Sequence, residues 1–174
     1  TQAQQMFTTL IEQMKIAEGL TEALKEANQM EWVQRMNNIQ ERAIGRVVFF
    51  VEKHWNELVK FSRRTPDNLN HWSAKYATIS DTTEETYKKA KDKRMGRYVA
   101  VNLENYETIE FRLFRGTLRY ETFIATLQLV NEICNTAIEL TDRELETLSW
   151  SDFVLRIDKE NRSELVNYLK SKRL

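Results

Sequence analysis

The stretch Arg97–Leu118, RYVAVNLENYETIEFRLFRGTL, decides the fold that we expect of this chain. It predicts two short strands, Arg97–Leu103 and Thr108–Phe114, joined by a polar turn at Glu104–Glu107. Only a few residues separate the strands, so they are expected to pair as an antiparallel hairpin. An isolated hairpin is marginally stable in water. The rest of the chain must therefore cover this one or extend it.

Side chains alternate between the two faces of a strand, which brings an acid and an arginine together in the second strand. The predicted faces of that strand are Ile109, Phe111 and Leu113 on one side and Glu110, Arg112 and Phe114 on the other. The predicted faces of the first strand are Val99, Val101 and Leu103 on one side and Tyr98, Ala100 and Asn102 on the other. A carboxylate two residues from a guanidinium is unusual in a strand that is otherwise apolar. This face is where polyanion or metal chemistry is most expected.

Long helices are predicted for the remainder, because the chain has only one proline and four glycines and is rich in helix-forming residues. The expected helices are Ala3–Ala27, Glu31–Phe61 with Gly45 as a possible bend, a helix beginning at Pro66, one ending near Ala90, Tyr120–Leu140 and Arg162–Lys170. The expected caps are Thr65, Thr141 with Glu144, and Ser149 with Asp152. The fold class is thus mainly α with a small antiparallel β element, in one compact domain. The basic run Lys88–Arg94 is expected to be a solvated connection.

Apolar spacing predicts which side chains of the C-terminal third pack inward. The expected inward positions are Ile124, Leu127, Val130, Ile133, Cys134 and Ala137, followed by Phe153, Leu155, Ile157, Leu165, Val166 and Leu169.

Composition narrows the class of protein. The 174 residues are 41% apolar, enough for one domain with a core, and 26 basic residues balance 26 acidic ones. A neutral chain does not favour broad electrostatic binding of nucleic acid, although a local basic patch stays possible. The single cysteine, Cys134, fits a reducing compartment, and no apolar run reaches the length of a membrane span. We therefore expect a cytoplasmic protein without a secretion signal or a membrane partner.

Several kinds of active site lack their signatures. One cysteine and two histidines, His54 and His71, do not give the paired spacings of a zinc site. Neither a Walker loop, a GxGxxG fingerprint nor a nucleophile elbow is present. Cys134 lies on the apolar side of its predicted helix, and both histidines are expected to be structural.

The acid and the arginines of the hairpin are the residues best suited to bind a metal ion or an anionic ligand. Glu110 is a candidate magnesium ligand, because magnesium prefers oxygen donors. Arg112 and Arg115 are candidate clamps for phosphate or carboxylate, which guanidinium binds in bidentate fashion. Further candidates for binding phosphate or substrate are Arg63, Arg64 and Asn102. The alternative is that Glu110 and Arg112 pair with each other on a half-exposed sheet face.

Three segments resemble the C-terminal part of the putative amidoligase family, whose members are phage and bacterial proteins related in fold to glutamine synthetase. They are AIGRVVFFVEKHWNELVKFSRRT, RYVAVNLENYETIEFRLFRGTL and RYETFIATLQLVNEICNTA, within Ala43–Leu174. The resemblance implies an ATP-dependent carboxylate–amine ligase ancestry, with ATP and magnesium as cofactors. It implies that Glu110 binds metal and that Arg112, Arg115 and Arg63 or Arg64 bind phosphates or substrate. It also divides the chain into a helical segment, 1–40, and an amidoligase-like domain, 41–174, with its hairpin at 97–114.

The family's N-terminal strands, which supply further metal ligands, are missing here, since Thr1–Gln40 reads as helix. One carboxylate does not hold the magnesium ions that acyl-phosphate formation needs. The chain is therefore predicted to be a truncated amidoligase-like protein without catalytic activity of its own and without a cofactor. Its predicted role is to bind a protein, as a phage-encoded inhibitor of a host defence nuclease (anti-CRISPR type) or as a homodimer. The alternative is one part of a ligase completed by another chain; a weaker possibility is nucleic-acid binding through Lys88–Arg94 and the arginines.

Overall fold

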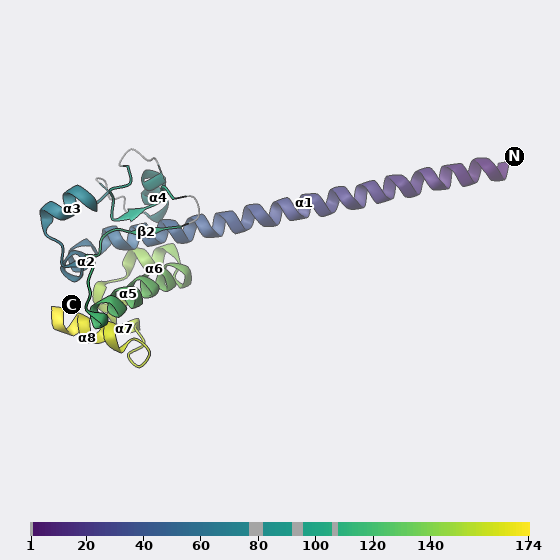
Figure 1. The fold of residues 1–174 in the computed structure, drawn as a ribbon. Coiled ribbons are helices and arrows are strands. Elements are labelled where there is room, and N and C mark those ends of the chain that lie inside the picture. Colours follow the sequence, from purple (N-terminus) through teal and green to yellow (C-terminus); the bar gives the residue numbers. More distant parts are fainter. Residues whose placement is uncertain (1, 77–81, 92–95, 106–107) are drawn as a thin grey trace. The chain divides into compact units, whose positions relative to one another are not determined.

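The computed structural model describes residues 2–76, 82–91, 96–105 and 108–174 (Figure 1). The chain divides into two compact units, Thr1–Gln40 and Glu41–Leu174, which we call the helical unit and the core unit. The helices of the described residues are α1 (Gln2–Lys53), α2 (Trp55–Ser62), α3 (Pro66–Trp72), α4 (Thr83–Lys91), α5 (Tyr120–Glu139), α6 (Asp142–Thr147), α7 (Trp150–Arg156) and α8 (Ser163–Lys172). The strands are β1 (Val101–Asn102) and β2 (Glu110–Phe111). A mainly helical fold with a small antiparallel sheet is confirmed.

The first helix differs from its prediction. A break between Ala27 and Glu31 is wrong, because α1 runs without interruption from Gln2 to Lys53. Neither glycine nor proline occurs between Ala27 and Glu31, so no residue there opposes the helix. The chain bends instead at His54, which separates α1 from α2 while its N–H still donates to the carbonyl of Phe50 at 3.0 Å.

The helix caps read from the sequence are confirmed. The Thr65 side chain accepts a hydrogen bond from the backbone N–H of Asn68, and Pro66 opens α3. The other two caps are the capping box of Thr141 with Glu144 at α6 and the Ser149 hydroxyl that accepts from the N–H of Asp152 at α7. These motifs were predictable because every atom of a cap lies within one helical turn.

The predicted hairpin forms, but its strands are much shorter than predicted. β1 and β2 pair antiparallel with Val101 opposite Phe111 and Asn102 opposite Glu110. The expected alternation fails in the first strand, because Val99, Ala100, Val101 and Asn102 are all buried. Part of the predicted turn lies outside the described residues, and of the basic run only Lys88–Lys91, in α4, is described.

A second partner for the first strand comes from far away in the sequence. Ala74, just after α3, forms a parallel bridge with Val99. Its N–H donates to the carbonyl of Tyr98 at 2.8 Å, and its carbonyl accepts from the N–H of Ala100 at 2.9 Å. The segment around β1 is therefore hydrogen-bonded along both of its edges, to Ala74 on one side and to the β2 strand on the other.

Aromatic side chains join the helices of the core unit. Phe50 of α1 packs edge-on against Phe153 of α7, with ring centroids 4.7 Å apart. Phe61 of α2 meets Tyr168 of α8 at the same separation. Figure 1 shows α5 to α8 gathered on one side of the core unit, and α5 and α8 pack against each other. Two inward predictions are wrong, because Leu127 and Leu155 are exposed. Among the described helices, none is both long enough and apolar enough to cross a membrane.

Candidate functional site

The hairpin brings three of the predicted site residues into contact. The Asn102 side chain donates to Glu110 Oε2 at 2.9 Å, and Arg112 donates to Glu110 Oε1 at 2.8 Å. The hydrogen bond from Asn102, together with the positive charge of Arg112, lowers the pKa of the Glu110 carboxyl below its usual value. The register explains the contact, since Asn102 lies directly opposite Glu110 and Arg112 follows two residues later on the same face.

Arg112 is held on three sides. Besides its bond to Glu110, its Nε donates to the carbonyl of Trp72 at 3.3 Å. Its guanidinium also lies over the Tyr98 ring, 5.3 Å from the ring centroid, in a cation–π arrangement. Both carboxylate oxygens of Glu110 and most of the Arg112 guanidinium are thus already engaged within the protein. The geometry agrees with the internal pairing that the sequence left open as an alternative.

The predicted arginines outside the hairpin approach its end. Arg63, which ends α2 in a left-handed conformation, donates to the carbonyl of Arg115 at 2.7 Å. Arg64 donates to the carbonyl of Phe114 at 3.3 Å. Burial lowers the pKa of Arg64, and the positive charges of Arg112 and Arg115 lower it further. Arg63 and Arg64 thus lie at the end of the hairpin that carries Arg112 and Arg115, and what these arginines bind stays a prediction.

A metal site receives no support from this geometry. In the parts of the chain that the structure describes, no three His, Cys, Asp or Glu side chains are grouped so that they could hold a metal ion. Glu110, the predicted magnesium ligand, is bonded to an amide and a guanidinium instead.

The sequence did not reveal a buried carboxyl group in α1. Glu52 is only 1% exposed, and its Oε1 accepts from the backbone N–H of Tyr76 at 3.1 Å. Its Oε2 has no hydrogen-bond partner among the described residues. Burial raises the pKa of Glu52 to about 7. The Tyr76 hydroxyl donates to the carbonyl of Val101 at 2.7 Å, so this pair connects α1 to β1. The position was missed because a glutamate within a helix is usually solvated.

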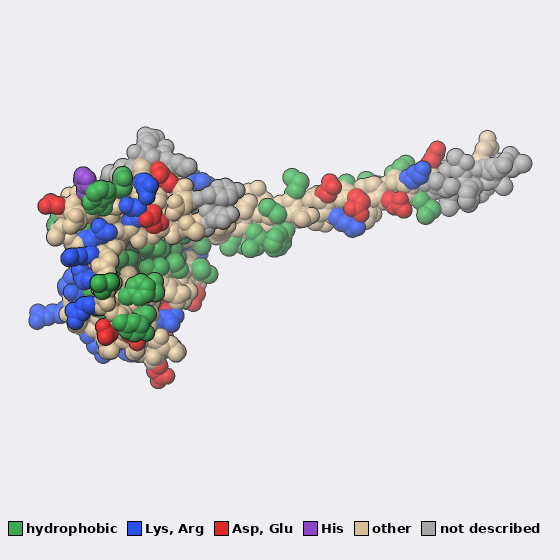
Figure 2. Space-filling view, viewed as in Figure 1, with side chains coloured by type: hydrophobic (Ala, Val, Ile, Leu, Met, Phe, Trp, Pro, Cys, Tyr) green, Lys and Arg blue, Asp and Glu red, His purple; other side chains and the backbone are tan. Residues whose placement is uncertain are grey.

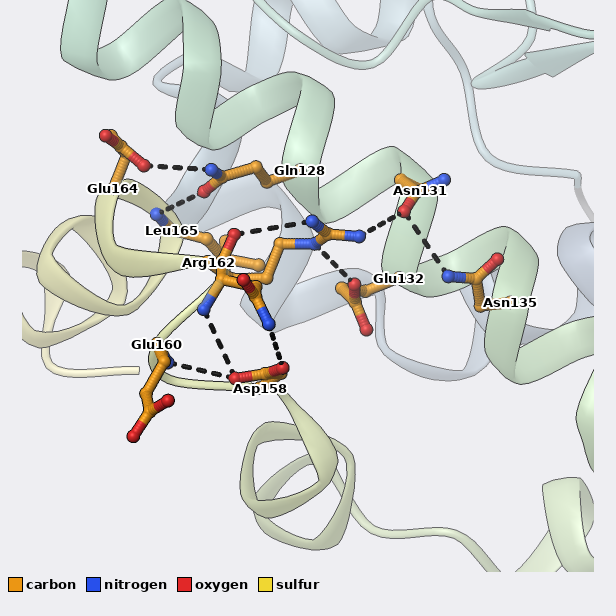
Figure 3. A network of polar contacts seen from close by, with 10 residues as sticks. Gln128, Asn131, Glu132, Asn135, Asp158, Glu160, Arg162, Glu164 and Leu165 are labelled. Atoms are coloured by element: carbon orange, nitrogen blue, oxygen red, sulfur yellow. Dashed lines mark hydrogen bonds and ion pairs between the residues drawn. The ribbon is translucent and has the colours of Figure 1, made fainter.

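A second polar cluster joins α5 to the start of α8 (Figure 3). Arg162 donates to Glu132 and to Asn131 of α5, each at 2.7 Å. Gln128 accepts from the backbone N–H of Leu165 at 2.8 Å, and so caps a helix that has no cap from its own N-cap side chain. All these groups are satisfied by one another, which is typical of a structural network. Its cap comes from another helix, which explains why no local motif predicted it.

Comparison with known proteins gives a partial match to a protein family. The family model described as transposon-encoded protein TnpV matches residues 1–48, which is just over a quarter of the chain. No curated protein and no solved structure matches the chain. The resemblance to amidoligases is therefore wrong: the matching family is a different one, and it covers the N-terminal region that the amidoligase assignment left out. The glutamine synthetase-like fold and the ligase ancestry rested on that resemblance, so neither is supported. The assignment of Glu110 as a magnesium ligand loses the same support.

Proposed function

We propose that this protein acts by binding rather than by catalysis, and that it associates with a second copy of itself through the helical unit. The observation that supports this proposal is the exposure of large apolar side chains on α1. Every described side chain from Glu12 to Gln40 is exposed. Among them, Leu24 and Trp32 are each 63% exposed. Figure 2 shows hydrophobic side chains distributed among charged ones along this unit.

The exposed apolar residues form two rows at helical spacing. The first row is Ala17, Leu20, Leu24 and Ala27, at spacings of three and four. The second row is Trp32, Met36 and Ile39, at spacings of four and three. Trp32 follows Ala27 by five positions, so at 3.6 residues per turn the second row begins roughly two fifths of a turn away around the helix. Apolar side chains on two sides of one helix are typical of a helix that packs in a bundle.

Association would bury surface that is costly to leave in water. Removing one such side chain from water contributes about 1.5–3 kcal/mol. A helix gains most of its stability from packing of an apolar face, and residues 12–40 show no such packing in the single chain. We place the centre of the contact at Trp32, because tryptophan is enriched among residues that dominate interface energies. A second copy is the partner we propose, since two-fold homodimers are the commonest oligomers.

The family match supports a proposal about the kind of genetic element in which this protein acts. Residues 1–48 include both apolar rows, and the family is described as transposon-encoded. We propose accordingly that the protein serves a mobile genetic element. The narrower expectation, an inhibitor of a host defence nuclease, stays a prediction without support from the structure or the comparisons.

Sedimentation velocity of the full chain tests the self-association. The variant Met36→Glu with Ile39→Glu places two charges in the second row and should shift the protein from dimer or larger species to monomer. The matched control is Gln34→Glu with Asn37→Glu, which adds the same charge at the same spacing to exposed positions outside that row. The control should sediment as the wild type does. A wild-type protein that stays monomeric at high concentration, or equal dissociation by both variants, would contradict the proposal.

A further inference from the structure

A second surface lies in the core unit, where arginines stand beside exposed aromatic residues. We call it the arginine–aromatic surface. Its members are Arg63, Arg64, Arg115, Arg119, Tyr120 and Phe123, from the end of α2, the loop after β2 and the first turns of α5. Figure 2 shows Lys and Arg side chains gathered over α2 and near the C-terminus of this unit. The self-association proposed above does not use this surface.

The arginines are oriented by the backbone and are not neutralised. Arg63 and Arg64 donate to the carbonyls of Arg115 and Phe114, which fixes the direction of their guanidinium groups. The ion pairs between described residues include none of Arg63, Arg64, Arg115 and Arg119. Carbonyl groups satisfy hydrogen bonds but leave the charge uncompensated. The surface therefore presents several positive charges to a ligand, although the chain as a whole is neutral.

Tyr168 of α8 lies beside the end of α2 that leads to Arg63, because its hydroxyl donates to the carbonyl of Phe61 at 3.4 Å. Burial raises the pKa of this hydroxyl, and the charges of Arg63 and Arg119 act against that rise. Lys172 lies over the ring of Tyr168, 5.4 Å from its centroid, and adds to the same positive region.

The aromatic residues stand beside these charges without a packing partner. Tyr120 is 68% exposed at the first position of α5, and Phe123 is half exposed one turn later. A spacing of three puts both rings on the same side of the helix. Neither ring belongs to the hydrophobic core or to the aromatic pairs of the described residues.

We propose that the arginine–aromatic surface binds single-stranded nucleic acid. Guanidinium groups bind phosphates in bidentate fashion, and aromatic rings stack on unpaired bases of any sequence. Arg115 and Arg119 contact the phosphates, and Tyr120 and Phe123 stack on the bases between them. A duplex is a poorer ligand, because its bases already stack on one another.

Fluorescence anisotropy of a labelled oligothymidylate, titrated with the full chain at several salt concentrations, tests this proposal. The logarithm of affinity should fall linearly with the logarithm of salt concentration, by about 0.7 per phosphate contacted. The variant Arg115→Ala with Arg119→Ala should reduce that slope by about 1.4, since each arginine neutralises one phosphate. The variant Tyr120→Ala should weaken binding by about fivefold or more and leave the slope unchanged.

Two control variants replace exposed residues outside the surface. Arg143→Ala removes an exposed arginine of α6, and Leu155→Ala removes an exposed apolar residue of α7. Neither should change affinity or slope. Undetectable binding at low salt, equal loss in the control variants, or duplex bound as tightly as single strands would overturn the proposal. Binding to phosphatidylglycerol vesicles in place of oligothymidylate would overturn it too, and would assign the surface to anionic lipid.

Discussion

The helix α1 contains two regions of opposite character. Every described side chain from Glu12 to Arg42 is exposed, whereas every residue from Val47 to Glu52 is buried. Burial of six successive residues covers all sides of a helix, which is found in the centre of a helical core. The backbone conformation is the same in both regions. Local helix propensity thus explains why α1 forms. The contribution of each region to the stability of the fold depends on what its side chains pack against.

The sharpest test of this comparison replaces one large side chain in each region with alanine. Phe50→Ala should lower the free energy of unfolding by about 3–5 kcal/mol, because it leaves a cavity against Phe153 and His54. Leu24→Ala should change it by less than about 0.5 kcal/mol, because the side chain is exposed. Urea unfolding followed by near-UV circular dichroism measures both.

The measurement is made at a protein concentration where the chain is monomeric, so that self-association does not stabilise the wild type relative to Leu24→Ala. Similar losses in the two variants would mean that residues 12–40 are packed in the monomer as tightly as the core, and the contrast between the two regions would be lost.

The parts of this fold that the sequence predicted are those decided within a few residues. Thr141 with Glu144 and Ser149 with Asp152 cap helices through atoms one turn apart. The pairing of Glu110 with Arg112 was foreseeable for a similar reason, since it needs only strand alternation, whereas the contact with Asn102 depends on a hairpin register that the sequence left open. The end of α1 at His54 was not predicted, because the same apolar spacing continues through it.

The parts that the sequence did not predict depend on distant contacts. Ala74 bridges Val99 across more than twenty residues, and nothing in the local pattern around Ala74 indicates a strand. Glu52 lies in the segment of α1 that is buried on all sides, where amphipathic spacing carries no information about which positions face solvent. Family resemblance did not supply these distant contacts, because the amidoligase assignment was wrong.

The buried end of α1 should also make stability depend on pH. The pKa of Glu52 is raised to about 7 from an ordinary value near 4.5, so the folded chain holds a proton that the unfolded chain releases. The contribution of this protonated carboxyl to the free energy of unfolding is fully present below pH 4.5 and is lost as pH rises through 7. The loss is on the order of 3 kcal/mol, since each pKa unit corresponds to about 1.4 kcal/mol. No described side chain in the exposed region between Glu12 and Gln40 is buried enough to behave in this way.

Urea unfolding of the wild type and of Glu52→Gln at a series of pH values isolates this effect. Glutamine keeps the shape of the protonated acid and still accepts from the N–H of Tyr76, but it does not titrate. The variant should lose the slope between pH 4.5 and 7 and be more stable than the wild type above that range. Parallel pH profiles for the two proteins would show that Glu52 is not protonated in the folded chain.

The smallest expected effect compares two glycines of α1, one in each unit. A Cβ at Gly19 meets no atom within 4 Å, whereas a Cβ at Gly45 lies 2.8 Å from Tyr87 Cβ and 3.3 Å from its Cγ. Replacing glycine with alanine in a helix stabilises it by about 1 kcal/mol, so Gly19→Ala should increase helicity in far-UV circular dichroism. At Gly45 overpacking against α4 costs about 1–3 kcal/mol and outweighs that gain.

The free energy of unfolding of Gly45→Ala should therefore fall by about 1 kcal/mol, as urea titration measures. Tyr87 meets the new methyl group with its Cβ rather than with the flexible end of its side chain, so relief requires α4 itself to shift. If Gly45→Ala stabilised the chain as Gly19→Ala does, α4 would have to pack against α1 less closely than the structure describes. Opposite signs from the same substitution in one helix would show directly that packing, and not propensity, separates its two regions.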